Sequence, residues 1–278
     1  MRREFWPLCC VLLLAIAAPG AHRAGADEPA VAVDAAVVLA ADVSRSIDDG
    51  EFALQRHGYA EAIQDQKLID AISTGLRGAI ALAYVEWAGE SEQKQVVDWA
   101  LIRNPADARA FATALTAAPR AFVGRTAIGS AIDFSFGLFN ETGFTTDRRI
   151  IDVSGDGTSN QGRAVTAARD TAVEAGAVIN GLTIFNRRAA AVGGYLALHT
   201  NPPGGLAQYY RDNVIGGKGA FVVPIDDFNS FADALLRKLV NEIAGGRSTC
   251  CNGQRVRVVG GSSGLLQPRP LQEGGSVP

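Results

Sequence analysis

The sequence predicts an α/β fold: a three-layer α/β/α, doubly wound arrangement whose sheet is mostly parallel with one antiparallel edge strand. Short and nearly continuous apolar segments, typical of strands buried on both faces, recur along the chain. They occur at 35–41, 79–87, 149–153, 177–184 and 220–223. Helical patterns of about 10–15 residues separate most of these segments, as in βαβ units. With 278 residues, 47% of them hydrophobic, the chain can bury one large core.

The connecting elements follow from the same kind of pattern. We expect helices at 47–65, 105–116, 163–175 and 228–243, and another after Thr126. Ser46 and Asp49, three residues apart, predict a capping box for the first of these helices. The segment 95–102 follows 79–87 closely enough to be its hairpin partner, which makes it the antiparallel edge strand. Residues 186–218, with "NPPGG" and "GGKG", are expected to form loops around one short helix.

Composition divides the chain into three parts. Residues 1–26 have the features of a signal peptide: a basic start, a short apolar core and a small-residue cleavage site. The apolar core is shorter than the ~20 residues that span a bilayer. We therefore expect a domain at 31–245 that is exported, periplasmic or secreted, with no stable membrane insertion after cleavage. Residues 246–278, rich in Gly, Ser and Pro, are expected to be a disordered tail, which contains the adjacent Cys250 and Cys251.

The charge balance argues against a polyanionic partner. The formal net charge is -3, and the sequence contains no run of Lys or Arg residues. Binding to nucleic acid is therefore not expected.

Polar side chains follow two of the expected strands and precede one of the helices. They are Asp42, Ser44 and Ser46 after the first strand, Thr126 before a helix, and Asp156 after the strand at 149–153. Ligands of open α/β sheets bind beyond the carboxyl ends of the strands, so these side chains are expected to converge. Two carboxylates and three hydroxyls, without His or Cys, suit a hard divalent cation, Mg²⁺ or alternatively Mn²⁺ or Ca²⁺.

Each of these segments also has an ordinary explanation. Ser46 or Thr126 alone could be a helix cap, and Asp156 followed by Gly157 could be a simple turn. Asp152 is another carboxylate on the same strand. We favour Asp156 as the site residue, because it lies at the exit of the strand and Asp152 lies inside it.

The order Asp-x-Ser-x-Ser, then Thr, then Asp-Gly resembles the von Willebrand factor A domain over roughly residues 33–243. The segments "DVSRSID", "AYVEWAG", "RTAIGSAIDF" and "IDVSGDG" are similar to an uncharacterised family of exported bacterial proteins with this domain. The resemblance implies a metal-ion-dependent adhesion site (MIDAS). Its direct ligands would be Ser44, Ser46 and Thr126, with Asp42 and Asp156 supplying charge and orientation. One coordination position would be left for an acidic side chain of a protein partner.

The sequence departs from the pattern of this family at two positions. Gly155 intervenes where the strand usually runs straight into the aspartate, and Arg45 stands where glycine is common between the two serines. Arg45 is expected to point away from the cation. It would either pair with Asp48 or Asp49, or act as a second anchor for an incoming carboxylate.

These observations favour a binding module over an enzyme. The alternative is a metal-dependent hydrolase or phosphatase with Asp42 as the nucleophile, which needs a general acid or base nearby. Ser44 and Arg45 cannot act as one at neutral pH, and His57 and His199 are expected to lie outside any polar cluster. A scaffold that binds no metal is a third reading.

Overall fold

The structure is a computed structural model that describes residues 30–245, so the expected signal peptide and tail lie outside the described residues. Its centre is a six-stranded sheet with the strand order β4-β3-β2-β6-β7-β8. The strands are β2 (Ala35–Asp42), β3 (Ile80–Trp87), β4 (Gln93–Ile102), β6 (Arg149–Gly155), β7 (Ala177–Ile184) and β8 (Val222–Ile225). All neighbours pair in parallel except β3 and β4, which pair antiparallel at one edge. The expected fold class is confirmed.

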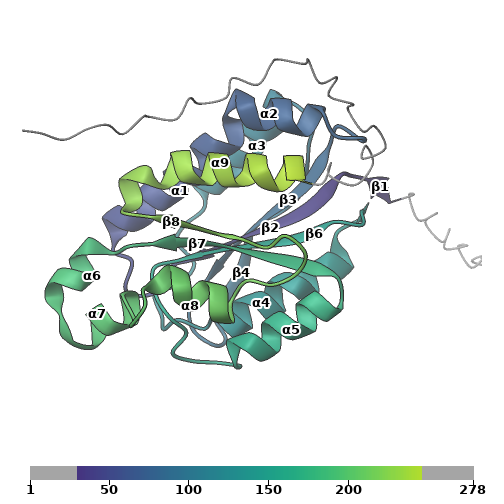
Figure 1. The fold of residues 1–278 in the computed structure, drawn as a ribbon. Coiled ribbons are helices and arrows are strands. Elements are labelled where there is room, and N and C mark those ends of the chain that lie inside the picture. The colour runs from purple at the N-terminus through teal and green to yellow at the C-terminus, as the bar shows by residue number, and fades with distance from the viewer. Residues whose placement is uncertain (1–29, 246–278) are drawn as a thin grey trace, which may run out of the picture.

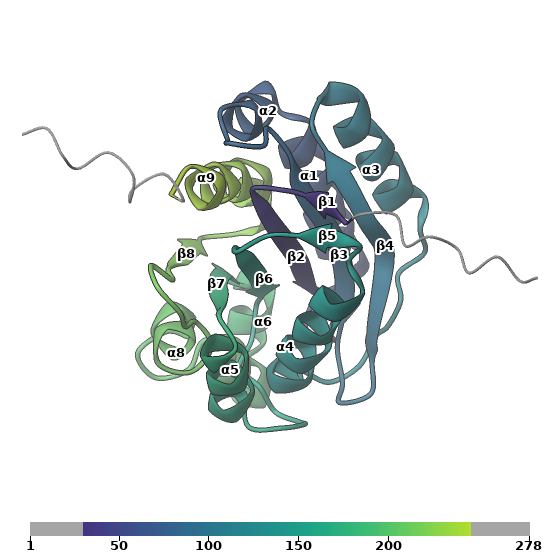
Figure 2. The same cartoon turned by 90° about the vertical axis from the view of Figure 1, so that its right-hand side faces the viewer.

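Two layers of helices cover the sheet (Figures 1 and 2). One layer contains α1 (Asp49–Gln64), α2 (Gln66–Ser73), α3 (Pro105–Ala117) and α9 (Phe231–Ala244), which follows the short turn η2 (Phe228–Ser230). The other contains α4 (Ile128–Gly137), followed by η1 (Leu138–Glu141), then α5 (Val165–Glu174) and α8 (Leu206–Asn213). Side chains alternate across the sheet, so Leu39 joins the core under α1 and α9 while Ala40 joins the core under α4.

The expected capping box at Ser46 is wrong, and the box lies two residues further along the chain. Helix α1 begins at Asp49, and Asp48 is its N-cap. The Asp48 carboxylate accepts from the Glu51 backbone N–H, and the Glu51 carboxylate accepts from the Asp48 N–H. Because Asp48 and Glu51 fill the capping roles, the Ser46 hydroxyl is free for another partner.

The segment 186–218 contains more helix than expected. Besides α8 it forms α6 (Arg187–Val192) and α7 (Gly194–Thr200). Glycine pairs at 193–194 and 204–205, all with positive φ, separate the three short helices. The patterns within such short helices are too brief to be distinguished from loops by sequence alone.

Both ends of the described chain lie at the amino end of the sheet, away from α6 and α7 (Figure 1). β1 (Val31–Ala32) pairs in parallel with β5 (Phe144–Thr145) just before β6. At the other end of the chain, the Arg148 guanidinium donates to the carbonyls of Glu242 and Ile243 in the last turn of α9.

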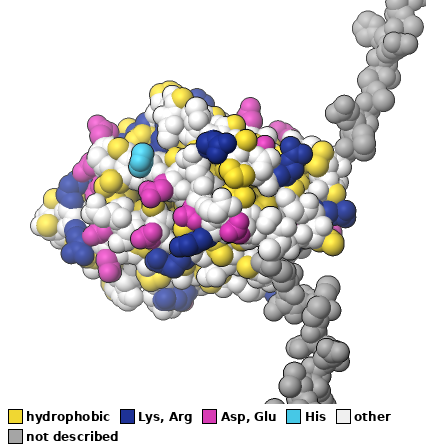
Figure 3. All heavy atoms as spheres, turned by 90° about the horizontal axis from the view of Figure 1, so that it is seen from above, with side chains coloured by type: hydrophobic (Ala, Val, Ile, Leu, Met, Phe, Trp, Pro, Cys, Tyr) yellow, Lys and Arg dark blue, Asp and Glu magenta, His cyan; other side chains and the backbone are white. Residues whose placement is uncertain are grey.

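The exterior agrees with the balanced composition. Figure 3 shows acidic and basic side chains interspersed over the face that carries α2 and α9. Among residues 30–245, no helix combines the length and the apolar character that crossing a membrane requires.

Candidate metal site

Asp42 and Asp156 lie at the carboxyl ends of two adjacent strands. Asp42 is the last residue of β2, Asp156 directly follows β6, and these two strands are hydrogen-bonded neighbours. After β2 the chain continues to β3, which is towards one edge of the sheet, and after β6 it continues to β7, which is towards the opposite edge. This is the point at which the winding reverses, where open α/β sheets bind their ligands.

Three hydroxyls converge on the same point. Ser44 Oγ lies 3.1 Å from Ser46 Oγ, and Thr126 Oγ1 donates to Ser44 Oγ at 3.3 Å. Ser46 Oγ donates to Asp156 Oδ1 at 2.6 Å. The structure therefore brings together all five residues that the sequence indicated as a metal site, and each of them is buried.

Neither hydroxyl with an ordinary alternative role is a helix cap. At the start of α1 the N-cap residue is Asp48, not Ser46. Helix α4 begins at Ile128 with Ala127 as its N-cap and without a capping side-chain hydrogen bond, so Thr126 lies outside it. The Ser46 hydroxyl is instead bonded to Asp156, and the Thr126 hydroxyl to Ser44.

The two carboxylates are held in an environment that disfavours their charge. Asp42 Oδ1 accepts from the Ser44 N–H at 2.7 Å, while the buried Asp42 Oδ2 has no hydrogen-bond partner among the described residues. Burial, followed by the negative charge of Asp156, raises the pKa of Asp42 well above its usual value. Burial also raises the pKa of Asp156 to about 6, although hydrogen bonds from Ser46 and Asn186 oppose the shift. A positive charge between the carboxylates would relieve both effects.

The donor set fits a small divalent cation. Two neighbouring ligands of an octahedral ion with bonds of about 2.1 Å lie about 3 Å apart, and the hydroxyl spacings of 3.1 and 3.3 Å match that separation. Asp42 Oδ2 is a buried oxygen in need of a partner. Within residues 30–245 no site is built from three or more His, Cys, Asp or Glu side chains, so any ion here would depend on the hydroxyls.

Arg120 fixes the loop that carries the two serines. Its guanidinium donates to the carbonyls of Val43, Ser44 and Ile47 at 2.8–3.2 Å and pairs with Asp49. No local pattern indicates this role, because Arg120 lies more than 70 residues from its partners.

A buried ion pair supports the segment around Arg120. Glu86, inside β3, pairs with Arg56 of α1 and accepts from the Ala121 N–H at 2.8 Å. Arg56 also donates to the carbonyls of Ala118 and Pro119. The pair thereby ties the start of the α3–α4 connection to the sheet.

Asn186 connects the loop that carries Ser44 and Ser46 to Asp156. Its Nδ2 donates to Asp156 Oδ2 at 2.8 Å and to the Ser46 carbonyl at 3.0 Å, while its Oδ1 caps α6. Arg188 adds a donor to the Ser46 carbonyl and pairs with Asp48. Both residues follow β7, whose end is beside that of β6.

The expectation that His199 lies outside any polar cluster is wrong. Its Nε2 lies 3.2 Å from Thr126 Oγ1, and its Nδ1 lies 3.2 Å from Thr158 Oγ1. Burial lowers the pKa of His199, which favours the neutral imidazole. His57 is exposed on α1, as expected.

Two glycines make room around the site. A Cβ at Gly157 would lie 2.5 Å from His199 Nε2. A Cβ at Gly155 would lie 2.6 Å from the hydroxyl oxygen of Tyr210 and 3.0 Å from Asp42 Oδ2. Gly155, the extra residue in "SGDG", thus accommodates a buried tyrosine beside Asp42.

Asp152 lies apart from the hydroxyls. Its carboxylate pairs with the buried Lys238 of α9 at 2.6 Å. Asp156, by contrast, contacts Ser46 directly.

Arg45 is exposed, and the acids proposed as its partners are paired elsewhere. Asp48 pairs with Arg188 and Asp49 with Arg120. The guanidinium of Arg45 therefore does not form the expected ion pair with either acid.

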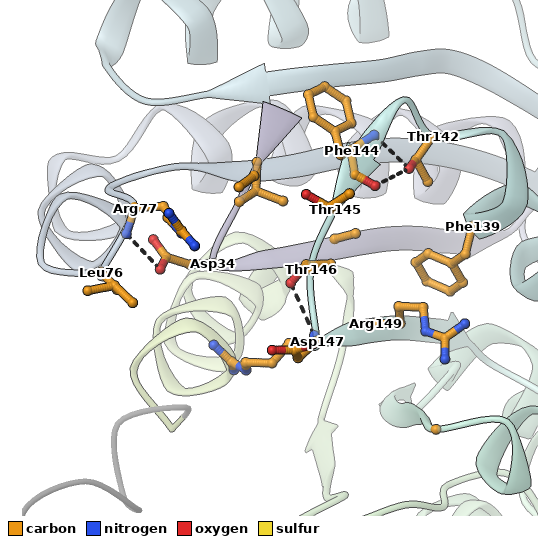
Figure 4. Close-up of a pocket in the computed structure, with 15 residues that line it drawn as sticks. Asp34, Leu76, Arg77, Phe139, Thr142, Phe144, Thr145, Thr146, Asp147 and Arg149 are labelled. Atoms are coloured by element: carbon orange, nitrogen blue, oxygen red, sulfur yellow. Dashed lines mark hydrogen bonds between the residues drawn. The ribbon is translucent and has the colours of Figure 1, made fainter. Parts of the chain in front are cut away.

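A separate hollow of about 780 Å³ lies at the opposite end of the sheet, beside β1 and β5 (Figure 4). Its polar groups serve local turns: Asp34 accepts from the Arg77 N–H, and Thr142 is bonded to Phe144. The hollow does not contain the carboxylate and hydroxyl cluster and is not a better candidate for the site.

The chain has the fold of a von Willebrand factor A-type domain. Residues 32–247 match the family described as "Protein of unknown function (DUF1194)", and the chain belongs to that family. A comparison with curated protein sequences found no match.

Solved structures share the fold at low sequence identity. Proximal thread matrix protein 1 from the mussel byssus is 14% identical, with a TM-score of 0.55 over 77% of this chain and 49% of its own. The same protein with a zinc-occupied MIDAS motif has a TM-score of 0.52, at the same identity and coverage. The pilus adhesin SpaC from Lactobacillus rhamnosus GG is 13% identical, with a TM-score of 0.51 over 77% of this chain and 30% of its own. The chain thus spans half or less of the length of these proteins.

Proposed function

We propose that this protein is an exported binding module that uses a divalent cation to capture an acidic group on a protein partner. The observation that carries the proposal is the convergence of three hydroxyls and two buried carboxylates at the winding reversal of the sheet. Ser44, Ser46 and Thr126 would hold the ion, with Asp42 and Asp156 supplying charge and orientation. A bound cation would neutralise the carboxylates and offer a coordination position to the partner's carboxylate.

The similar structures support this reading at the level of the site. The mussel matrix protein has been observed with zinc in its MIDAS motif, and SpaC is a pilus adhesin. Both names point to extracellular structural or adhesive roles, which agrees with an exported protein.

The environment of Asp42 supports binding over catalysis. A nucleophilic carboxylate must reach its substrate, but Asp42 is fully buried and its Oδ1 is engaged by the Ser44 N–H. The imidazole of His199 contacts Thr126 and Thr158 and is not bonded to Asp42. We therefore propose no catalytic role for the hydroxyl cluster.

Cation-dependent stabilisation tests the proposed site. Only the folded chain joins these loops, so Mg²⁺ or Mn²⁺ should raise the melting temperature. At a hundredfold excess of cation over Kd, the free energy of unfolding should increase by about 2.7 kcal/mol. Asp42→Ala and Ser44→Ala should lose most of this shift. Ser135→Ala, which changes a buried serine near the far end of α4, should keep it. Equal shifts in all four proteins would place the ion elsewhere, and no shift in any would leave a metal-free scaffold.

Arg45 provides a test of partner capture. Its exposed guanidinium stands beside the serines and can fork onto a carboxylate. Partners should be recovered on immobilised protein with Mg²⁺ and lost with a chelator. Arg45→Gly should retain the cation-induced shift yet bind such a partner more weakly, chiefly at low ionic strength. Equal affinity of Arg45→Gly and the wild type at low salt would remove Arg45 from the interface.

A further inference from the structure

His199 is delivered to the hydroxyl cluster by a short helix that the sequence did not predict. It lies near the end of α7, and only 6% of its surface is exposed. Tyr195, one turn earlier, stacks on the imidazole at 5.9 Å with an interplanar angle of 4°. The Tyr195 hydroxyl accepts from Asn160 Nδ2 at 3.2 Å, and Asn160 Oδ1 accepts from the Thr126 N–H. The ring is therefore held over the segment that carries Thr126.

The partners of the ring orient one nitrogen towards the cluster. Nδ1 lies 3.2 Å from Thr158 Oγ1, and the Thr158 N–H donates to the His199 carbonyl at 3.0 Å. When Nδ1–H donates to the Thr158 hydroxyl, Nε2 presents its lone pair on the side of Thr126. Metal-binding histidines in proteins are commonly oriented in this way through their second nitrogen. The absence of a side chain at Gly157 leaves the space in which Nε2 lies.

The separation of the donors agrees with a shared ion. Nε2 lies 3.2 Å from Thr126 Oγ1, close to the spacings of 3.1 and 3.3 Å among the hydroxyls. All are near the ~3 Å that separates adjacent ligands of a six-coordinate ion with bonds of about 2.1 Å. Three hydroxyls and one imidazole supply four donors, which leaves room for water or a carboxylate.

We propose that His199 is a direct nitrogen ligand of the cation, which makes this a mixed nitrogen and oxygen site that binds Zn²⁺ in preference to Mg²⁺. The inference rests on the proposed cation site and specifies its metal. Imidazole is a good ligand for zinc, whereas Mg²⁺ and Ca²⁺ favour oxygen. The affinity for Mn²⁺ should lie between those for Mg²⁺ and Zn²⁺, since manganese binds most weakly of the divalent metals in the first transition row.

Calorimetric titration of the folded protein with Zn²⁺ and Mg²⁺ tests this preference. The wild type should bind Zn²⁺ at least 100-fold more tightly than Mg²⁺. His199→Ala should weaken Zn²⁺ binding about 10- to 100-fold and change Mg²⁺ binding less than threefold. His57→Ala, which removes the exposed histidine of α1, should match the wild type with both ions.

Two further measurements distinguish the loss of a metal ligand from misfolding of the His199→Ala variant. Thr158→Val retains the imidazole but removes the partner of Nδ1, and should also weaken Zn²⁺ binding selectively. Pulsed electron paramagnetic resonance of the Mn²⁺-loaded protein should show coupling to a histidine nitrogen, which ¹⁵N-histidine labelling shifts and His199→Ala abolishes.

The outcomes separate this inference from the proposed function. If Asp42→Ala abolishes binding but His199→Ala leaves the ratio of Zn²⁺ to Mg²⁺ affinity unchanged, the cation site stands and the nitrogen ligand is refuted. Binding of neither ion by the wild type would overturn both.

Discussion

Gly155 shows how a single residue can shape a site without contributing a functional group. It ends β6, with Asp42 on one side and the buried Tyr210 of α8 close above it. A side chain at this position would compete for space with Asp42 Oδ2, the carboxylate oxygen that has no partner among the described residues. The inserted glycine in "SGDG" is thus explained by close packing.

Gly155→Ala should destabilise the protein by about 1–3 kcal/mol, because its Cβ would overlap the Tyr210 hydroxyl and crowd Asp42. The cation-induced rise in melting temperature should fall as well, since Asp42 must shift. Denaturant midpoints with and without cation measure both effects.

Gly137→Ala is the matched control for this substitution. The residue is exposed with φ -57°, and a Cβ there would meet nothing within 4 Å. Its stability should be unchanged or slightly higher. Equal behaviour of the two alanine variants would contradict the packing role of Gly155.

At the same scale, the sequence could indicate the ligands but not their supports. The five candidate ligands lie in local patterns at the ends of strands or beside a helix, which are visible in one dimension. Arg120, Asn186 and His199 act on residues of the site 30 to 140 positions away, so only the tertiary structure brings them there. Arg120 and Asn186 lie in connecting segments and His199 lies in the short helix α7, where periodicity conveys little information.

Among the elements, α9 is attached to the sheet by a buried ionic cluster. Lys238 pairs with Asp152 of β6 and with Glu242 one turn later, and Glu242 accepts from Asn180 of β7 at 2.7 Å. Two acids share one lysine, so the fully ionised cluster carries an excess negative charge. Burial, with the charge of Asp152 in addition, raises the pKa of Glu242 to about 7, although Lys238 and Asn180 act against the shift.

The cluster predicts a stability that falls as the pH rises. Glu242 releases its proton near pH 4.5 in the unfolded chain but near pH 7 in the folded protein. Between these values the folded state binds more protons, so the free energy of unfolding decreases with rising pH and levels off above about 7. Glu242→Gln should remove this pH-dependent loss of stability, on the order of 1–3 kcal/mol. The variant keeps the ion pair of Lys238 with Asp152, which has no net charge.

Urea unfolding of the wild type and Glu242→Gln at intervals from pH 4.5 to 8 measures the difference. Glu174→Gln, at an exposed position of α5, serves as the control and should follow the wild-type profile. A difference between Glu242→Gln and the wild type that did not vary with pH would show that Glu242 is ionised throughout.

The ends of the six strands of the central sheet were predictable to within about two residues, whereas the two-residue strands β1 and β5 and the short helices were not predicted. Buried parallel strands show as continuous apolar runs, and the edge strand β4 followed from its hairpin spacing. Helix α2 was missed because Asp65 ends α1 and at once caps the next helix, leaving no intervening loop signal. Helices α6 and α7 contain only six and seven residues. The glycines at their boundaries are typical of loops, so the sequence pattern favours a loop there.

For the whole molecule, the described residues and the family match cover nearly the same part of the chain. The structure describes 30–245 and the family match covers 32–247. The expected domain bounds, 31 and 245, stay a prediction. The expected tail at 246–278 lies outside the described residues and contributes few apolar side chains by sequence.

A chain truncated after Arg247 should therefore melt within about 2 °C of the full-length protein, since the removed segment has little apolar surface to bury. Any intermolecular disulfide formed under oxidising conditions should vanish with Cys250 and Cys251. Thermal unfolding followed by circular dichroism and a non-reducing gel measure the two effects. A loss of 5 °C or more would show that the segment docks on the domain.

The placement of both ends of the described residues, 30 and 245, at the amino end of the sheet has a mechanical consequence. A ligand held by Asp42, Ser44 and Thr126 pulls at the carboxyl ends of the strands, while anything joined beyond β1 or α9 pulls from the opposite end. Tension between the two would run lengthwise along β2 and β6, whose parallel ladder pairs six residues. Such a load would shear many hydrogen bonds at once instead of opening them one after another, so a partner bound at the proposed site would load the sheet in the direction in which its ladders resist best.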